Sequence, residues 1–450
     1  MAAVAASNPQ QSLDKGGSLD LYKGGEELRR AVAALAGPNA EHREHREGER
    51  PASFSDPPTS SASNAAQLIP ISVKSADHST RELAFAAQRY AKAAHKDPSD
   101  YESVYNHGLA LQELASRMAS SRTEQMQLLQ QACDRYKAAW NLKQSSSSAL
   151  YNWGVALSDM SRVLKTTDRA TANGLLTEAA EKYATSLQWS ANNPQALNNW
   201  GLVLQELSTM APDHEKGQLV GQSVQKFRNA IRLRPEFDRA CYNLGTVYYS
   251  HAHTLSSSSA AQLSSQLTKD RQRERQERAD GEEIEHAFKL AALYITLAFA
   301  LQPKRDVYKR SLKVVRTLLP QGVLCAGSLQ AVVPATAHTS YERWETRYFL
   351  LDHKGLRDTS DEQSSSGNAP DPYRIALSDI ADVKPCMDPS LPAGHAFWVS
   401  LQSRPTGLYF CAGSLEAAEG WVDAILMVAH IAKTHQLRAL EHALTIEFPA

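Results

Sequence analysis

The chain has 450 residues, a formal net charge of −1 and 42% hydrophobic residues. This length indicates two or three domains, and the near-zero charge gives the whole chain no electrostatic attraction to nucleic acid or anionic lipid. The five cysteines are far apart and form no Cys-x-x-Cys pair, so a disulfide framework or a zinc site is not expected. The start of the chain lacks the features of a secretory or transit peptide, and we expect a cytoplasmic protein.

Residues 1–78 are rich in Ala, Ser, Gly, Pro and charged residues, which predicts a disordered N-terminal region. Order is expected to begin at Ser79, because Ser79 and Glu82 have the spacing of a helix capping box. From there to residue 319, apolar residues recur at the i, i+3, i+4 and i+7 positions of amphipathic helices.

A repeat of 44–47 residues runs through this helical region. Each copy has the pattern Asn-x-Gly near the start of a first helix, here called helix A, and the glycines are Gly108, Gly154, Gly201 and Gly245. In each second helix, helix B, a small residue precedes an aromatic one by four positions, as in Ala132 and Tyr136. Small residues at these places allow two helices to pack closely, so stacked helix pairs are predicted.

These residues resemble the tetratricopeptide repeat (TPR) family, whose repeat is about 34 residues long. The resemblance implies an all-α superhelix over residues 79–319. The additional residues in each copy are polar and lie between helix A and helix B, where we expect them to lengthen helices or loops. The longest insert, residues 256–283, is predicted to be flexible, as a solvated helix or a mobile loop.

The recurring asparagine is unfavourable in a helix interior, because its side chain competes for backbone hydrogen bonds. Its amide offers a donor and an acceptor, which match an extended peptide backbone. The TPR resemblance therefore implies a peptide-binding groove, with tyrosines preceding three of the asparagines. Its predicted residues are Asn106, Asn152, Asn199, Asn243, Tyr105, Tyr151 and Tyr242. The alternative is that each asparagine bonds to the neighbouring repeat.

After residue 319 the pattern changes to the two-residue alternation of strands, predicted at 327–333, 344–352, 373–380, 395–402 and 408–412. A long helix is predicted at 414–444. Together with Gly327, Trp344, Arg347 and Trp421, this order resembles the pleckstrin homology (PH) family. The resemblance implies a β-barrel capped by a C-terminal helix over residues 320–445, with Trp421 in the open end of the barrel.

Lipid binding by this PH-like domain is disfavoured, because residues 320–435 hold eight Lys/Arg against thirteen Asp/Glu and Glu345 stands where a basic residue would help. We expect a protein contact or a structural role instead. The segment 304–316 is more basic, and it is either a solvated cap or a contact for an anionic partner or membrane. Residues proposed for that contact are Lys309, Arg310, Lys313, Arg316 and Arg347.

No phosphate-binding loop, nucleophile elbow or metal-ligand set is recognisable in the sequence. We therefore expect that the protein is not an enzyme and that it binds no cofactor, metal, small-molecule substrate or nucleic acid. We expect instead a scaffold or adaptor that binds an extended peptide of a partner. The alternative is a peripheral membrane protein that binds anionic lipid through the PH-like domain and the 304–316 helix. The arrangement resembles a green-lineage TPR family associated with the trans-Golgi network, early endosome and actin, which implies a role in membrane trafficking or at the cytoskeleton.

Overall fold

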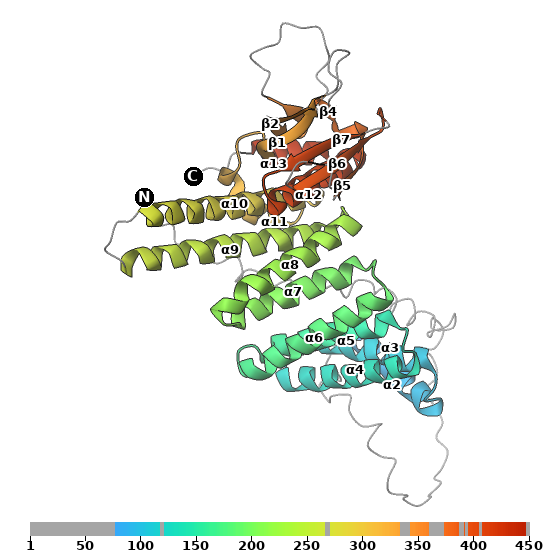
Figure 1. Cartoon of the computed structure of the whole chain (residues 1–450). Coiled ribbons are helices and arrows are strands. Elements are labelled where there is room, and N and C mark those ends of the chain that lie inside the picture. The colour runs from blue at the N-terminus through green and yellow to red at the C-terminus, as the bar shows by residue number, and fades with distance from the viewer. Residues whose placement is uncertain are drawn as a thin grey trace, which may run out of the picture. The chain divides into compact units, whose positions relative to one another are not determined.

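The structure is a computed structural model of the chain (Figure 1). It describes residues 77–117, 121–265, 271–333, 343–359, 373–386, 391, 395–404 and 407–446, without side chains from 258 to 280. The disorder predicted for residues 1–78 therefore lies almost entirely outside the described residues. Two compact units divide the chain, Gly16–Leu219 and Val220–Ala450, called here the N-terminal and C-terminal units. The predicted domain boundary at 319/320 follows the change from helices to strands and stays a prediction.

Consecutive helices of the N-terminal unit pack against each other as TPR-like pairs (Figure 1). The B helices α4 and α6 have 21 residues each, and the A helices α3, α5 and α7 have 17 or 18. The polar inserts form the first turns of α4, α6 and α8, so they lengthen helices as expected. The helices are α2 (His78–Lys96), α3 (Tyr101–Arg117), α4 (Arg122–Leu142), α5 (Ser147–Leu164), α6 (Arg169–Trp189) and α7 (Pro194–Met210), followed by α8 (Asp213–Leu233), which continues into the C-terminal unit.

Most of these helices begin with a side chain that accepts from the backbone N–H three residues later, as N-caps do. The first cap differs from the prediction. Asp77, not Ser79, accepts from the Thr80 N–H at 2.7 Å, and the helix begins at His78. Asn193 caps α7, and Pro194 lies in the first turn, where a proline is tolerated because the N–H that it lacks would have no helical partner.

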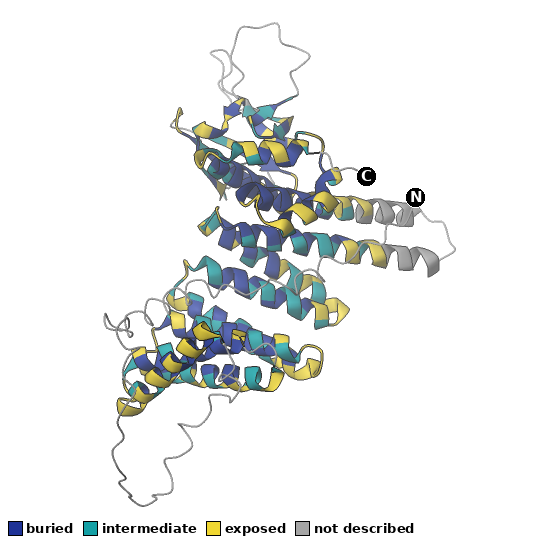
Figure 2. Ribbon diagram, turned by 180° about the vertical axis from the view of Figure 1, so that it is seen from behind, coloured by how far each residue is buried: buried dark blue, intermediate teal, exposed yellow. Residues whose placement is uncertain are grey.

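At Gly108 and Gly154 the absence of a side chain allows the aromatic residue of helix B to touch helix A, and at Gly245 it makes room for Ile295 of α10 (Arg271–Leu301). A Cβ atom on Gly108 would lie 2.8 Å from Tyr136 Cε1, and one on Gly154 would lie 2.9 Å from Tyr183 Cε1. Both tyrosines are 0% exposed. Buried residues therefore lie where the paired helices face each other (Figure 2), and the expected reason for the glycine is confirmed.

The C-terminal unit continues with α9 (Asp238–Ser265), α10 (Arg271–Leu301), α11 (Asp306–Val315) and the short η4 (Arg316–Leu318). Helix covers both described parts of the 256–283 insert, which favours the helical alternative; its flexibility is untested. The segment Gly281–Leu301 of α10 is long and apolar enough to cross a membrane, but 72% of its most apolar stretch is buried inside the protein. We interpret it as the core helix of this unit, in contact with α9, α11 and η4.

An antiparallel seven-stranded sheet follows, with the order β4-β3-β2-β1-β7-β6-β5. It is open: within the described residues the edge strands β4 and β5 do not pair, so the expected closed barrel is not found. Two strands were missed, β3, which is short and begins with a glycine, and β5, which contains Pro385. The strands are β1 (Cys325–Val333), β2 (Arg343–Leu351), β3 (Gly355–Asp358), β4 (Ile375–Ala376), β5 (Ile380–Cys386), β6 (His395–Leu401) and β7 (Leu408–Ala412), with η5 (Leu377–Asp379) between β4 and β5.

The predicted final helix is two helices, α12 (Leu415–Lys433) and α13 (Leu437–Thr445). His435 separates them in the left-handed region, with φ of 60°. The Gln436 N–H donates to the Ile431 carbonyl at 3.0 Å, which is the long bond of a Schellman helix end. Because histidine stands where glycine is usual, the sequence carried no signal for this end.

Replacing Gly154 by leucine should destabilise the N-terminal unit by about 1–3 kcal/mol, because the side chain must displace the buried Tyr183 ring. Gly174 lies in α6, and a Cβ atom added to it would have nothing within 4 Å, so Gly174→Ala is the matched control and should be neutral or stabilising. Urea unfolding followed by circular dichroism measures both variants. Equal stability of the two variants would contradict the assigned A–B contact.

Candidate functional site

The recurring asparagines connect successive repeats through tyrosine hydroxyls. In the N-terminal unit the Asn152 Nδ2 donates to the Tyr105 hydroxyl at 2.7 Å, and the Asn199 Nδ2 donates to the Tyr151 hydroxyl at 3.1 Å. Each bond joins the helix A of one repeat to the helix A of the next. The C-terminal unit has a similar contact at 3.0 Å between the hydroxyls of Tyr242 and Ser311, a residue of α11.

Exposure varies along this set of residues. Asn199 is 1% exposed. Asn198 stands where the other repeats have a tyrosine, and its Nδ2 donates to the Asn199 Oδ1 at 3.1 Å. Asn152 and Tyr151 are half-buried, and so is Asn106 in α3. Among the described residues no helix A precedes α3, so Asn106 has no preceding tyrosine of this kind. We call Tyr105, Asn106, Tyr151, Asn152, Asn198 and Asn199 the Tyr–Asn row.

These bonds correspond to the structural alternative, in which asparagine bonds to the neighbouring repeat. They do not exclude a role in peptide binding, because each bond uses one N–H of an amide that carries two N–H groups and a carbonyl oxygen. The half-buried Asn106 and Asn152 are the members of the row best placed for a ligand. Asn243, in α9 of the C-terminal unit, is also half-buried.

An acidic residue follows each asparagine by seven positions in the three repeats of the N-terminal unit. Seven residues are about two helical turns, so the acid and the asparagine share one face of helix A. Each acid is already paired: Glu113 with Arg117 at 3.1 Å, Asp159 with Arg162 at 2.8 Å, and Glu206 with Lys165 at 2.6 Å. The Asn-x₆-acid spacing was readable in the sequence and was missed.

A buried polar chain lies beside this face. The Tyr136 hydroxyl donates to Gln112 Oε1 at 2.7 Å, and the Gln112 Nε2 donates to Asp159 Oδ2 at 3.2 Å. Burial raises the pKa of Asp159, and the nearby Arg162 opposes this shift. Helices α3, α4 and α5 are thereby joined by side-chain hydrogen bonds as well as by apolar packing.

The residue after each asparagine is aromatic in the N-terminal unit: His107, Trp153 and Trp200. The three side chains are half-buried, and the Lys182 Nζ lies 4.3 Å from the centre of the Trp153 ring, a cation–π distance. Burial lowers the pKa of His107 to about 4, and the positive charge of Arg135 adds to this shift. His107 is therefore neutral in the folded protein at pH 7.

The predicted basic face on α11 is smaller than expected. Lys309, Arg310 and Lys313 are exposed, as a contact for an anionic partner requires. Arg316 is buried and donates to the backbone carbonyls of Leu319, at 3.1 Å, and of Leu444. It follows the last residue of α11, where the chain turns toward the sheet, so placing it on the exposed face was wrong.

Arg347 on β2 is engaged by carboxylates. Its guanidinium lies 2.7 Å from Asp358 and 3.2 Å from Glu345, and its side chain is 17% exposed. Asp358 belongs to β3, a short strand that the alternation of residues does not predict, so this pairing is visible only in the structure. Two carboxylates neutralise Arg347, which weakens its proposed role toward an anionic partner.

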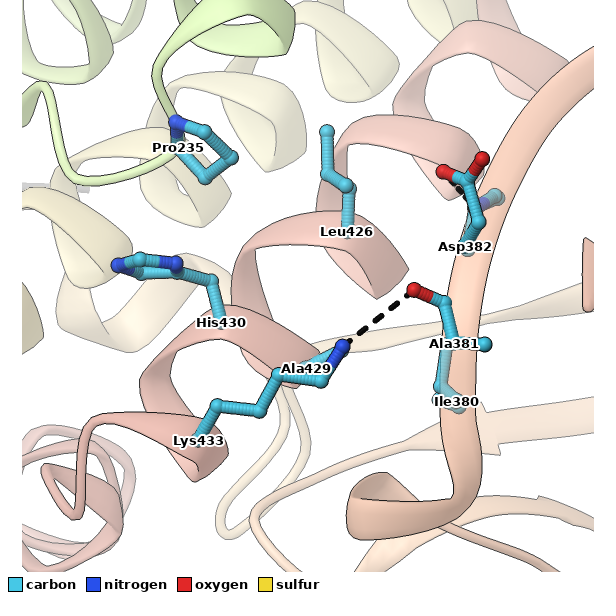
Figure 3. Close-up of a pocket in the computed structure, with 9 residues that line it drawn as sticks. Pro235, Ile380, Ala381, Asp382, Leu426, Ala429, His430 and Lys433 are labelled. Carbon is cyan, nitrogen blue, oxygen red and sulfur yellow. Dashed lines mark hydrogen bonds between the residues drawn. The ribbon is translucent and has the colours of Figure 1, made fainter. Parts of the chain in front are cut away.

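A cavity of about 140 Å³ lies between β5, α12 and the turn that precedes α9 (Figure 3). Apolar residues such as Ile380, Val383 and Leu426 line it, and the Lys433 Nζ donates to the Ala381 carbonyl at 3.3 Å. Small-molecule sites usually have about 300–1,000 Å³, so this cavity is small for a substrate. Among the described residues no group of three or more His, Cys, Asp or Glu side chains could hold a metal ion.

Part of the chain matches the model of a known protein family. Residues 175–277 span most of α6, all of α7, α8 and α9, and the first residues of α10. They match the family described as "Plant specific mitochondrial import receptor subunit TOM20". The match covers under a quarter of the chain. No curated protein matches the chain.

Solved structures with similar repeats include MamA, with 16% identity over 51% of this chain and 96% of that one and a TM-score of 0.30. YrrB, described as a TPR protein with an unusual peptide-binding site, has 15% identity, coverages of 52% and 94%, and a TM-score of 0.26. A TPR repeats protein from Bacteroides fragilis has 15% identity, coverages of 54% and 93%, and a TM-score of 0.27. Because these TM-scores and identities are low, the TPR-like assignment depends on the helix pairs and contacts of this chain and not on the solved structures.

The low pKa of His107 predicts a pH-dependent stability. In an unfolded chain histidine titrates near pH 6.5, so between about pH 6.5 and 4 the unfolded state binds a proton that the folded state does not. Stability should therefore fall as the pH decreases through this window. His107→Leu, which places there the residue found at the equivalent Leu244, should reduce the loss of urea midpoint between pH 7 and 5. The exposed His95→Leu is the control, and an equal loss in both variants would contradict the prediction.

Proposed function

We propose that this chain is a non-catalytic scaffold whose N-terminal unit binds an extended peptide segment of a protein partner along the Tyr–Asn row. The observation that carries this proposal is the recurrence of half-buried amides and aromatic rings at one phase of successive A helices. Stacked repeats place such residues at regular intervals, and a peptide in extended conformation presents its backbone groups at regular intervals as well.

The asparagine amides would bond the peptide backbone and not its side chains. Each such bond contributes roughly 0.5–1.5 kcal/mol net, so specificity has to come from neighbouring residues. The half-buried Trp153 and Trp200 supply apolar area for the side chains of the peptide. The tyrosine hydroxyls hold the asparagines of the following repeats in place before the ligand arrives. The asparagine side chains therefore lose less conformational entropy when the peptide binds.

For the C-terminal sheet we propose a PH-like role in contacting a second protein. Support comes from β1, which pairs with both β2 and β7, and from Trp421, whose ring lies 3.8 Å from where a Cβ of Gly327 would be. The neutralised Arg347 argues against a phosphoinositide headgroup at this place. Lys309, Arg310 and Lys313 would supply only a weak, nonspecific attraction to an anionic membrane.

The location of the scaffold has two candidates. The resemblance of the domain arrangement favours a peripheral position at the trans-Golgi network or early endosome, with a link to trafficking or actin. The match of residues 175–277 favours instead a receptor-like role at mitochondria, in which these repeats bind a segment of an imported protein. Imaging of the tagged full chain with markers for both compartments separates the two, since each predicts colocalisation with one marker only.

The peptide proposal predicts different effects for two matched variants. Asn152→Ala with Asn199→Ala removes the amides, whereas Tyr105→Phe with Tyr151→Phe removes only the hydroxyls that hold them. Each pair should reduce stability by about 1 kcal/mol per lost bond. The asparagine pair should also weaken peptide binding by about tenfold or more, because it removes amide groups that bond the peptide backbone. The tyrosine pair should weaken binding less, because the amides remain and are only held less firmly.

Peptides selected from a displayed random library on the wild-type chain serve as probes, and fluorescence anisotropy measures their affinity. Asn173→Ala, which changes an exposed asparagine of α6, is the control and should leave affinity unchanged. If both pairs weaken binding equally, the asparagines act only through the repeat structure. If no selected peptide binds in a manner sensitive to the asparagine pair, the proposed groove is wrong.

The weak membrane attraction should depend on α11. Lys309→Gln with Lys313→Gln in the full chain should abolish binding to anionic liposomes, and added salt should do the same, because screening acts over about 8 Å at physiological ionic strength. Arg347→Ala should have no effect on this binding. Headgroup-selective binding that Arg347→Ala abolishes would instead establish the lipid-binding alternative.

A further inference from the structure

Helix α12 is buried on nearly all sides. From Ala418 to Ile431 its residues are buried except for the partly exposed Glu419, Leu426 and His430. A helix that is apolar all round is enclosed by other elements, whereas a helix covering one face of a sheet keeps a polar outer face. The question is therefore which elements enclose α12.

One side of α12 contacts the sheet. The helix packs against β5, β6, β7 and η5. Trp421 lies over Gly327 of β1, 3.8 Å from the position of an added Cβ. This side gives the sheet its hydrophobic core.

The other side of α12 contacts the repeat helices of the same unit. A Cβ on Gly420 would lie 3.1 Å from the Leu290 side chain of α10, so the two helices are close there. The Met427 sulfur lies 3.7 Å from the Cys241 sulfur of α9, and both residues are 0% exposed. This side is therefore part of the helical core.

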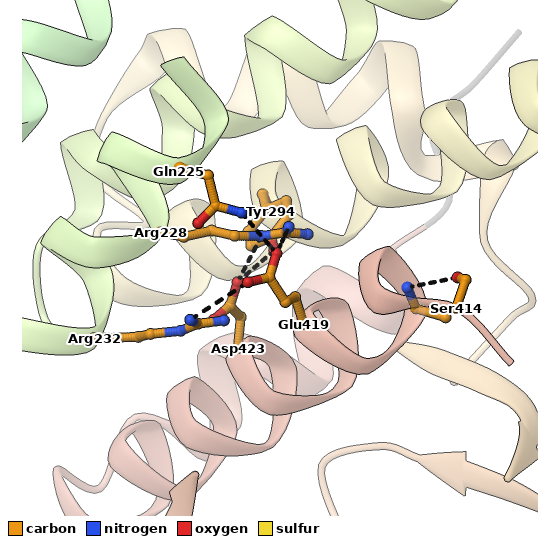
Figure 4. A network of polar contacts seen from close by, with 8 residues as sticks. Gln225, Arg228, Arg232, Tyr294, Ser414, Glu419 and Asp423 are labelled. Atoms are coloured by element: carbon orange, nitrogen blue, oxygen red, sulfur yellow. Dashed lines mark hydrogen bonds and ion pairs between the residues drawn. The ribbon is translucent and has the colours of Figure 1, made fainter. Parts of the chain in front are cut away.

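A cluster of charges joins this second side to α8 (Figure 4). Asp423 is 0% exposed, and its carboxylate lies 3.1 Å from Arg228 Nε and 2.9 Å from Arg232 Nε. The Tyr294 hydroxyl of α10 also donates to it, at 2.8 Å. One turn earlier, Glu419 pairs with Arg228 and accepts from the Gln225 Nε2 at 3.0 Å.

The spacing of these residues is complementary. Arg228 and Arg232 are four apart on α8, and Glu419 and Asp423 are four apart on α12, so each pair lies on one helix face. Arg228 is 2% exposed. A buried arginine and a buried aspartate are stable only when each neutralises the other, so separating the two helices would leave unpaired buried charges or expose an apolar surface to water.

We propose that α12 is a coupling helix, shared between the core of the sheet and the core of the repeat helices α8–α10, so that the C-terminal unit folds and opens as one body. The sheet is then not a mobile domain on a linker. A partner that binds it acts directly on the last repeats. This inference is independent of peptide binding by the Tyr–Asn row, which lies in the other unit.

Hydrogen exchange of the full chain, followed by mass spectrometry, tests the coupling. Amides of α10 and of β6 should exchange through the same opening, with equal protection in their slowest members. Asp423→Asn should accelerate exchange in both segments by the same factor, about tenfold or more, while α4 and α5 of the other unit stay unchanged. Faster exchange in β6 without a change in α10 would overturn the proposal.

Two further variants keep the test decisive if Asp423→Asn fails to fold. Arg232→Gln removes a partner at the more exposed end of the cluster, and it should accelerate α10 and β6 equally but by a smaller factor. Arg438→Gln removes an exposed positive charge from α13, outside the cluster, and should alter neither segment. If Arg232→Gln affects α10 alone, α12 does not couple the two cores.

Discussion

The close approach of helix A to helix B at a glycine is the constraint on which the repeat depends. At Gly108 and Gly154 the buried ring of a tyrosine occupies the space where a side chain would be. The asparagine two residues earlier is rotated by about 200° around the helix, so it faces away from that ring. It can therefore meet the neighbouring helix A. In the Asn-x-Gly of Asn152 and Gly154, the glycine side of helix A packs against helix B, and the asparagine side contacts the neighbouring repeat.

The same row of residues serves stability and, in our proposal, recognition. The bonds from Asn152 to Tyr105 and from Asn199 to Tyr151 hold successive repeats in register. The bond to Tyr105 uses the Nδ2 of Asn152, so it also fixes the direction in which the amide carbonyl of this half-buried residue points. Acidic residues two turns later are neutralised by neighbouring Arg or Lys side chains, so the row as a whole presents amides and aromatic rings more than net charge.

In the C-terminal unit the decisive element is α12. It belongs to the core of an open sheet and also contacts α8, α9 and α10 through apolar residues and the Arg228–Asp423 cluster. This explains why no compact-unit boundary falls between the helices and the strands of this region. Burial of ion pairs adds specificity of docking, because any other register of α12 against α8 would leave a charge unpaired.

The sequence by itself determined the helix pairs, five of the seven strands and the close contact at the glycines, because these follow from local periodicity and residue size. Only the tertiary structure decided the rest. Asp358 comes from a strand that was not predicted, and it neutralises Arg347; Arg316 looked like part of a basic face and is buried; His435 ends a helix without a glycine. The sheet order and the shared position of α12 likewise depend on pairings between residues far apart in the chain, and local patterns of hydrophobicity and charge do not encode which distant partner a residue meets.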